Sequence, residues 1–101
     1  MLEQYGVIPV VTFRREEVAL PMRGALCAGG LPVAEICFRT DCAKACIEAG
    51  RKAFPDMCIG AGTVLSGAQC ADALAAGAQF IVSPGYSEEV ALLCEERKVF
   101  Y

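Results

Sequence analysis

Two kinds of segment alternate along the chain. Short, mostly apolar runs are separated by longer stretches in which apolar residues recur at the three-to-four-residue spacing of a helix. The short runs are predicted to be buried strands at residues 7–13 and 33–40, a strand with a glycine-rich exit at 57–65, a strand with a turn at 79–85, and the start of a fifth strand at 99–101. The longer stretches are predicted to be helices, and they cover residues 15–30, 41–54, 66–78 and 87–98. The pattern therefore predicts strand and helix in strict alternation.

Residues typical of helix ends support these boundaries. Ser66 and Ser87 precede apolar helical patterns and are predicted N-caps, because a serine hydroxyl accepts a hydrogen bond from a free amide of the first turn. Gly29 and Gly30 close the first helical stretch. Pro21 lies inside that stretch, so the helix either begins near it or kinks there.

The spacing of the strands favours a parallel sheet. The predicted strands start near residues 7, 33, 57, 79 and 99, which are 20 to 26 residues apart. That is the length of one strand, a crossover helix and two short loops, and such crossovers return the chain to a parallel neighbour. Two architectures fit, an open doubly wound sheet and a (β/α)8 barrel. An open sheet that binds nucleotides carries a glycine-rich loop after its first strand, and the segment 12–17 has no glycine, so the barrel is favoured.

Composition and charge narrow the functional classes. With 101 residues, of which 55% are hydrophobic, the chain is predicted to be a single domain over residues 1–101. We expect no membrane span and no signal peptide, because no apolar run is long enough and no basic segment precedes the N-terminal apolar residues. The cytoplasm is the expected location. A net charge of −3 with no basic run argues against a nucleic-acid partner.

The seven cysteines and the absence of histidine exclude several kinds of site. A Cys/His nucleophile and a Ser/His/Asp triad both need histidine, and the chain has none. It also has no C-x-x-C pair, so a zinc site is not expected. The favoured interpretation is that the thiols act as small hydrophobic groups. An alternative is a soft-metal or redox site at Cys42 and Cys46, which are spaced i and i+4 on a predicted helix.

The strand 33–40 carries two charged residues in an apolar setting. Glu35 and Arg39 have the same parity, so their side chains project from the same face of the strand. Burial would raise the pKa of the Glu35 carboxyl, and such a group suits proton transfer at carbon next to a carbonyl. Arg39 offers a planar fork for a substrate carboxylate or phosphate. The alternative is a buried ion pair without a chemical role.

Ligands of parallel α/β proteins gather at the carboxyl ends of the strands. At these ends the chain places Thr12, the run from Gly60 to Thr63, and the run from Ser83 to Gly85. Gly62 would let a ligand approach the backbone closely, and Thr63 adds a hydroxyl beside it. The alternative for the glycines is tight packing between strand and helix, and for Ser83 to Gly85 a simple turn.

Four motifs in this order resemble one enzyme family. The motifs are VIPVVTF, LPVAEICFRT, CIGAGTVL and GAQFIVSPG. Together they resemble the N-terminal half of 2-keto-3-deoxy-6-phosphogluconate (KDPG) aldolase and 4-hydroxy-2-oxoglutarate (KHG) aldolase, over nearly the whole chain. The resemblance implies a (β/α)8 TIM barrel of which the first four to five βα units are present here. It also implies a homotrimeric class I aldolase that needs no metal or other cofactor and releases pyruvate and an aldehyde from a small keto acid through a lysine imine.

The resemblance also implies roles for individual residues. Glu35 falls on the family's general acid/base, and Arg39 and Thr63 fall on residues that hold the carboxylate of the pyruvyl portion. Pro84 falls on a turn that lines the same pocket, and Gly62 belongs to the substrate-binding run. Thr12 stands where some relatives carry an arginine, so that contact is not expected.

The family's imine lysine lies on a sixth strand, which these 101 residues do not include. The three lysines that are present, Lys44, Lys52 and Lys98, lie on predicted helices and face solvent by pattern. An imine-forming lysine must be desolvated, so this chain alone is predicted to be inactive. Two other functions stay open: another barrel enzyme acting on keto acids or sugar phosphates, such as an epimerase, and a non-catalytic half-barrel that self-associates or binds small anions.

Overall fold

A computed structural model describes residues 2–38 and 42–101. Helix and strand alternate, as the sequence predicts. The elements are, in chain order, η1 (Leu2–Gln4), β1 (Val10–Val11), η2 (Glu16–Val18), α1 (Ala19–Ala28), β2 (Val33–Cys37), α2 (Ala43–Ala53), β3 (Cys58–Gly62), α3 (Gly67–Ala76) and α4 (Glu88–Arg97). Each of the four predicted helices is present, with ends within a few residues of those expected from the pattern.

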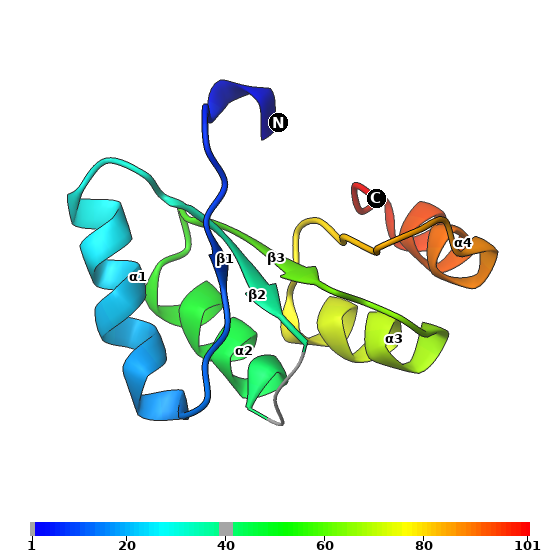
Figure 1. The fold of residues 1–101 in the computed structure, drawn as a ribbon, viewed down its shortest axis with the longest axis horizontal. Helices are drawn as coiled ribbons and strands as arrows, with labels where there is room; N and C mark the ends of the chain where they lie inside the picture. Colours follow the sequence, from blue (N-terminus) through cyan, green and yellow to red (C-terminus); the bar gives the residue numbers. More distant parts are fainter. Residues whose placement is uncertain (1, 39–41) are drawn as a thin grey trace.

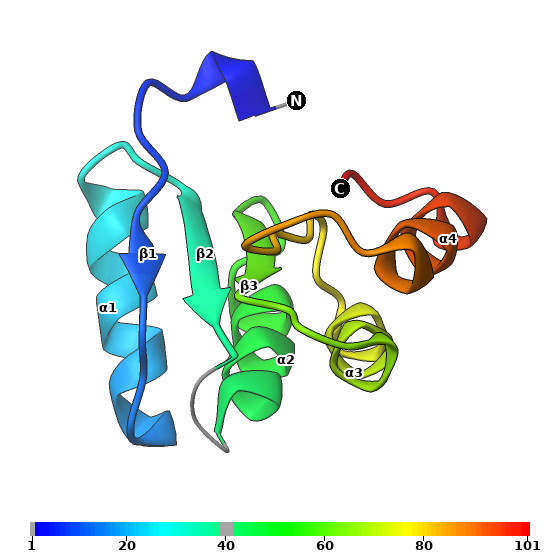
Figure 2. The ribbon, with the colours of Figure 1, turned by 45° about the vertical axis from the view of Figure 1, so that its right-hand side comes forward.

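The strands form a parallel sheet in the order β1-β2-β3, which confirms an α/β fold with a parallel sheet. Val10 pairs with Glu35, and five consecutive pairs join β2 to β3, from Val33 with Cys58 to Cys37 with Gly62. The helices form a layer beside the sheet, with α1 at one end and α3 and α4 at the other (Figure 1). A turned view shows β1 and β2 running in the same direction (Figure 2).

The outer strands are shorter than predicted. The strand predicted over 7–13 is reduced to the two residues of β1, and the strands predicted at 79–85 and 99–101 are single bridges, Ala61 with Ile81 and Phe80 with Phe100. Those three predictions are wrong in extent. Among the described residues, β2, β3 and the Phe80–Ile81 position each have a neighbour on both edges, whereas β1 and the Phe100 position have one. Pro9, just before β1, also lacks the N–H that a ladder needs, although its carbonyl accepts from the Glu35 amide.

Alternation along β2 and β3 divides the buried residues into two groups. Ala34, Ile36, Ile59 and Ala61 face the helices and belong to the larger core cluster. Val33 and Cys58 point to the other face and pack with Phe80. The N-terminal segment covers that second group through its partly buried apolar residues, which are Leu2, Tyr5 and Ile8, together with Leu31.

The predicted helix signals act as expected. The hydroxyl of Ser66 accepts a hydrogen bond from the Gln69 amide at 3.2 Å, and that of Ser87 accepts one from the Val90 amide at 3.3 Å. Both predicted N-caps are confirmed. Pro21 is the third residue of α1 and lies in the first turn, where a missing N–H breaks no bond within the helix. The helix therefore begins just before Pro21.

The helix layer buries one arginine that the sequence pattern did not single out. Arg23 on α1 is fully buried, and its Nη1 donates a hydrogen bond to the carbonyl oxygen of Cys46 on α2. Its guanidinium carbon lies 5.6 Å from the centre of the Phe13 ring. Gly50 leaves the space for it, because a side chain there would overlap the guanidinium. Arg23 Nε and Nη2 have no hydrogen-bond partner among residues 2–38 and 42–101, and burial lowers the pKa of the group.

The cysteines behave mainly as core residues. All seven are free thiols, and five of them are buried. Cys42, at the start of α2, is partly buried and its thiol donates to the Phe13 carbonyl at 3.0 Å, while Cys46 is buried below it. Within residues 2–38 and 42–101 there is no group of three or more histidine, cysteine, aspartate or glutamate side chains placed to hold a metal.

Candidate functional site

Glu35 lies at the centre of β2, on the face of the sheet that the helices do not cover. Its side chain is half-buried, and desolvation raises the pKa of its carboxyl above the ordinary value. This agrees with the direction predicted from the apolar strand. The backbone at Glu35 is held on both sides, by the pairing with Val10 and the register with Gly60. The strand thus fixes where the carboxyl is presented.

Gly62 provides the space that the Glu35 carboxyl occupies. It is the last residue of β3 and lies diagonally across from Glu35, and a side chain at this position would overlap the carboxyl oxygen Oε1. Val82 approaches the same point from the next strand position. The glycine that the sequence assigns to close ligand approach therefore admits the carboxyl of Glu35. Its predicted contact with a substrate stays a prediction.

Hydrogen bonds join the segments that follow β2, β3 and the Ile81 bridge position. The Phe38 amide donates to the Gly62 carbonyl at 2.6 Å, and the Val64 amide donates to the Val82 carbonyl at 2.9 Å. The hydroxyl of Ser83 also donates to the Val64 carbonyl at 2.8 Å. Thr63 is half-buried and lies between Gly62 and Val64, whose backbone groups form these hydrogen bonds.

The predicted site residues lie at this edge to different extents. From the centre of β2, the Glu35 carboxyl reaches Gly62 at the carboxyl end of β3, and Thr63 directly follows Gly62. Pro84 is exposed and follows Ser83 in the next turn. Arg39 lies outside the described residues. The sequence did not identify Val82, although its parity with Phe80 on the predicted fourth strand places it on the same face as Glu35.

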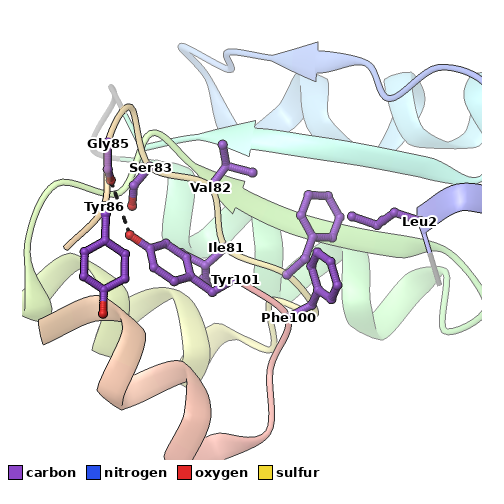
Figure 3. A pocket seen from close by; sticks show the side chains of 9 residues that line it. Leu2, Ile81, Val82, Ser83, Gly85, Tyr86, Phe100 and Tyr101 are labelled. Carbon is purple, nitrogen blue, oxygen red and sulfur yellow. Dashed lines mark hydrogen bonds between the residues drawn. The ribbon is translucent and has the colours of Figure 1, made fainter. Parts of the chain in front are cut away.

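A pocket of about 430 Å³ opens beside this edge (Figure 3). Its lining includes Val82 and Ser83 from the fourth strand position and the aromatic side chains of Tyr86, Phe100 and Tyr101. The Tyr101 hydroxyl donates to the Gly85 carbonyl at 3.4 Å and accepts from the Ser87 amide at 3.0 Å, which ties the end of the chain to the turn that holds Pro84. Glu35 is not part of the lining, so the pocket adjoins the predicted site through Val82.

None of the three lysines of the chain is placed for imine chemistry. Lys44, Lys52 and Lys98 are all exposed, and Lys44 forms a surface ion pair with Asp72 at 3.8 Å. Imine formation needs a lysine that is shielded from water, which an exposed side chain is not. The predicted solvent exposure of these lysines is confirmed.

The arrangement favours proton transfer. A half-buried carboxyl with a raised pKa can donate and accept a proton near neutral pH more readily than a fully solvated one. It stands at the carboxyl edge of a parallel sheet, where α/β proteins bind their ligands.

No helix among the described residues is both long and apolar enough to cross a membrane.

Comparison with known sequences gives a consistent result. The family model "Aldolase: KDPG and KHG aldolase" matches residues 1–101. A 2-dehydro-3-deoxy-phosphogluconate aldolase of Treponema pallidum is 48% identical over 93 residues, which are 92% of this chain and 44% of that protein. The KHG/KDPG aldolase of Escherichia coli K12 is 48% identical over 82 residues, which are 81% of this chain and 38% of that protein. The chain therefore spans less than half the length of these relatives.

Solved structures agree with the sequence relatives. The KDPG aldolase of Legionella pneumophila, with pyruvate captured as a covalent carbinolamine intermediate, has a TM-score of 0.88 and 41% identity. The match covers 95% of this chain and 47% of that one. The aldolase of Zymomonas mobilis ZM4, solved with 3-phosphoglycerate, has a TM-score of 0.85 and 37% identity over 94% of this chain and 45% of that one.

Proposed function

Because the chain belongs to the KDPG and KHG aldolase family, we propose that it supplies the proton-transfer half of a class I aldolase. The reaction is cleavage of KDPG or KHG to pyruvate and an aldehyde. The observation that carries the proposal is the Glu35 carboxyl, half-buried at the carboxyl edge of the sheet with a raised pKa. The related aldolase of Legionella pneumophila supports it, since its structure holds pyruvate as a covalent carbinolamine intermediate.

In this proposal Glu35 moves protons at the carbons that separate. Once the keto group of the substrate is held as an imine, the carboxylate accepts the proton of the C4 hydroxyl while the bond between C3 and C4 breaks. The resulting carboxylic acid then returns a proton to C3 of the enamine, which yields the imine of pyruvate. A raised pKa suits both steps, because the group must accept a proton and release it near neutral pH.

The remaining site residues hold the substrate in this proposal. Thr63 and Arg39 bind the carboxylate of the pyruvyl portion, and Gly62 lets the substrate approach the backbone beside the Glu35 carboxyl. Pro84 lies in the turn that lines the substrate site. The imine lysine belongs to the portion of the relatives that this chain does not match, because Lys44, Lys52 and Lys98 are exposed. The partner is thus a small keto acid, and the 101 residues alone are inactive.

The barrel and the assembly are part of the same proposal. The described sheet and its two bridges correspond to the first four to five βα units of a (β/α)8 barrel, within one domain over residues 1–101. The complete protein would be a homotrimer located in the cytoplasm and would need no cofactor. The relatives' greater length supports this proposal, since the matched portion is 38–44% of the two sequence relatives described above.

Trapping with borohydride tests the inactivity of the chain. Incubated with pyruvate and sodium borohydride, the 101-residue chain is expected to gain no stoichiometric pyruvyl adduct, because no lysine is desolvated. Intact mass spectrometry measures this directly. Stoichiometric labelling of Lys98 or of another lysine would show that the imine forms within this chain.

A fusion tests the role of Glu35. Residues 1–101 replace the corresponding N-terminal part of the E. coli relative, and pyruvate release from KDPG and KHG is measured. Glu35→Gln should lower kcat by roughly 10²–10⁴-fold while pyruvate binding is kept. Glu48→Gln changes an exposed carboxyl on α2 and is the matched control. An active fusion in which Glu35→Gln has no effect would remove Glu35 from the mechanism.

A further inference from the structure

Two thiols face each other where α3 packs on α4. Cys70 is the fourth residue of α3 and Cys94 the seventh of α4, and their sulfur atoms are 3.8 Å apart. Both side chains are fully buried. The two helices lie side by side at one end of the helix layer in both views (Figures 1 and 2). This contact brings together residues that are 24 positions apart in the chain.

We propose that Cys70 and Cys94 are a thiol pair that small disulfides such as oxidised glutathione convert to an intramolecular disulfide. The sulfur atoms of a disulfide are about 2.05 Å apart, so the pair must close by roughly 1.8 Å from its present contact. The proposal is independent of the aldolase activity, since neither thiol lies at the edge that holds Glu35.

The reaction balances with the oxidant alone. One thiol loses its proton, and its thiolate attacks a sulfur of oxidised glutathione and releases one glutathione thiolate. The second protein thiolate attacks the mixed disulfide and releases the other. The two glutathione thiolates take up the two protons, so the products are one protein disulfide and two reduced glutathiones.

Burial sets the rate of this reaction. Desolvation raises the pKa of the Cys70 thiol, and burial beside Cys70 raises the pKa of Cys94 to about 12, so thiolates are scarce in the closed structure. Because both side chains are fully buried, oxidised glutathione reaches either sulfur only after α4 separates from α3. Once formed, the bond holds α4 on α3, and the turn that carries Pro84 leads directly into α4.

Cys42 and Cys46 form a second pair of neighbouring thiols, with which the Cys70 and Cys94 pair can be compared. They also interact through their thiols, but both belong to the start of one helix, and Cys42 already donates to the Phe13 carbonyl. A bond between them would close only one helical turn. A bond between Cys70 and Cys94 closes a loop of about 25 residues and constrains the unfolded chain much more, because the constraint grows with loop length.

The test is oxidation of the 101-residue chain followed by mapping of the bond. The chain is treated with oxidised glutathione, free thiols are blocked, and the unreduced protein is cut after glutamate. Trypsin is unsuitable, because residues 53–97 contain one arginine, at the very end, and no lysine, and so leave Cys70 and Cys94 in one peptide. Cleavage after Glu89 separates them. We expect a cross-linked pair of peptides containing Cys70 and Cys94, and a Tm that rises by roughly 10 °C and falls back on reduction.

Matched variants make the result specific. Cys94→Ala and Cys70→Ala should each remove the cross-link and the reversible rise in Tm, whereas Cys27→Ala, in α1, should keep both. The map of the unmutated chain decides the question even if a variant does not fold. Cross-linking mainly between Cys42 and Cys46, mixed disulfides with glutathione that persist at Cys70 or Cys94 as the end product, or a Cys70–Cys94 bond that lowers the Tm would each overturn the proposal.

Discussion

The two faces of the sheet are built from the same strands but are covered by the rest of the chain to different extents. On the helix side, alternate residues of β2 and β3 such as Ile36 and Ile59 are completely buried. On the other side, the N-terminal segment covers only the group around Val33 and Phe80. Beyond that group, Val10 is 62% exposed and Phe100 is 59% exposed, although both lie on strand positions of the sheet.

The difference separates the roles of the two faces. The helix side stabilises the fold, because its apolar residues are sealed by α1, α2 and α3. The open side holds Glu35 and uses glycine at positions 60 and 62, where side chains would collide with Phe80 and with Glu35. Its exposed apolar residues lie next to two sheet edges. That combination is typical of protein interfaces rather than of a solvent-exposed surface.

The largest expected effect concerns association. Strands of a parallel sheet are normally covered on both faces, so the 101-residue chain should bury its open face against another copy and show little or no monomer at micromolar concentration. Sedimentation velocity measures the distribution. Phe100→Lys and Val10→Lys, at opposite edges of the open face, should shift it towards monomer.

Leu92→Lys is the control for these variants, because Leu92 is 58% exposed but lies on α4 and not on a strand position of the sheet. It should leave the distribution unchanged. A well-folded monomer of the unmutated chain with a cooperative melt would contradict this prediction and the half-barrel account of the fold.

The second prediction tests the sealed side through Arg23. Its aliphatic stem and guanidinium fill space beside Gly50, but two of its nitrogens lack partners, so the charge itself adds little stability. Arg23→Met keeps most of the volume and removes the buried charge, whereas Arg23→Ala leaves a cavity. The alanine variant should be less stable than the methionine variant by about 2–5 kcal/mol in urea denaturation. Equal stabilities would mean that the helix layer collapses into the space.

The third prediction separates the two glycines of β3. A methyl group at position 60 would overlap the ring of Phe80, which is buried and cannot move away easily, so Gly60→Ala should cost roughly 1–3 kcal/mol. At position 62 the methyl group meets the end of the Glu35 side chain, which can turn aside. Gly62→Ala should therefore lose less stability but lower kcat in the fusion. Both are measured by urea denaturation and pyruvate release, and a larger loss of stability for Gly62→Ala would reverse the assignment.

The sequence predicts the regular parts of this molecule well and the boundary between its faces less well. Helix ends follow from local chemistry, which is why Ser66, Ser87 and Gly29 mark them correctly. Strand length depends on neighbours that a local pattern does not contain, so the outer strands were overestimated. The packing of Gly62 against Glu35 is likewise a contact between strands.

Arg23 shows a different kind of limit. It stands at i+4 from Ala19 and i−4 from Cys27, so its helical face could have been predicted as the inward one. An arginine on such a face is normally read as a surface residue. The glycine that accommodates it lies 27 positions away on another helix, where no local pattern indicates the pairing.

The smallest expected effect is the pH dependence of stability at Glu35, on the open face. Desolvation raises the pKa of its carboxyl in the folded chain above that in the unfolded chain. Below the unfolded pKa both states are protonated, and the group contributes no difference. As the pH rises through the unfolded pKa towards the folded one, the folded state retains the proton longer, so the free energy of unfolding falls and then stays lower.

Glu35→Gln removes this titration, so the variant should gain stability relative to the unmutated chain as the pH rises, and the gain should level off above the folded pKa. Urea denaturation of both proteins at one concentration, from about pH 3 to about pH 8, measures the difference, with Glu48→Gln as the control. The gain should be modest, because half-exposure lets water solvate part of the carboxylate. A variant that instead loses relative stability as the pH rises would show that the ionised form has a favourable partner in the folded protein. Glu35 would then be better described as one member of a charge pair than as a desolvated acid.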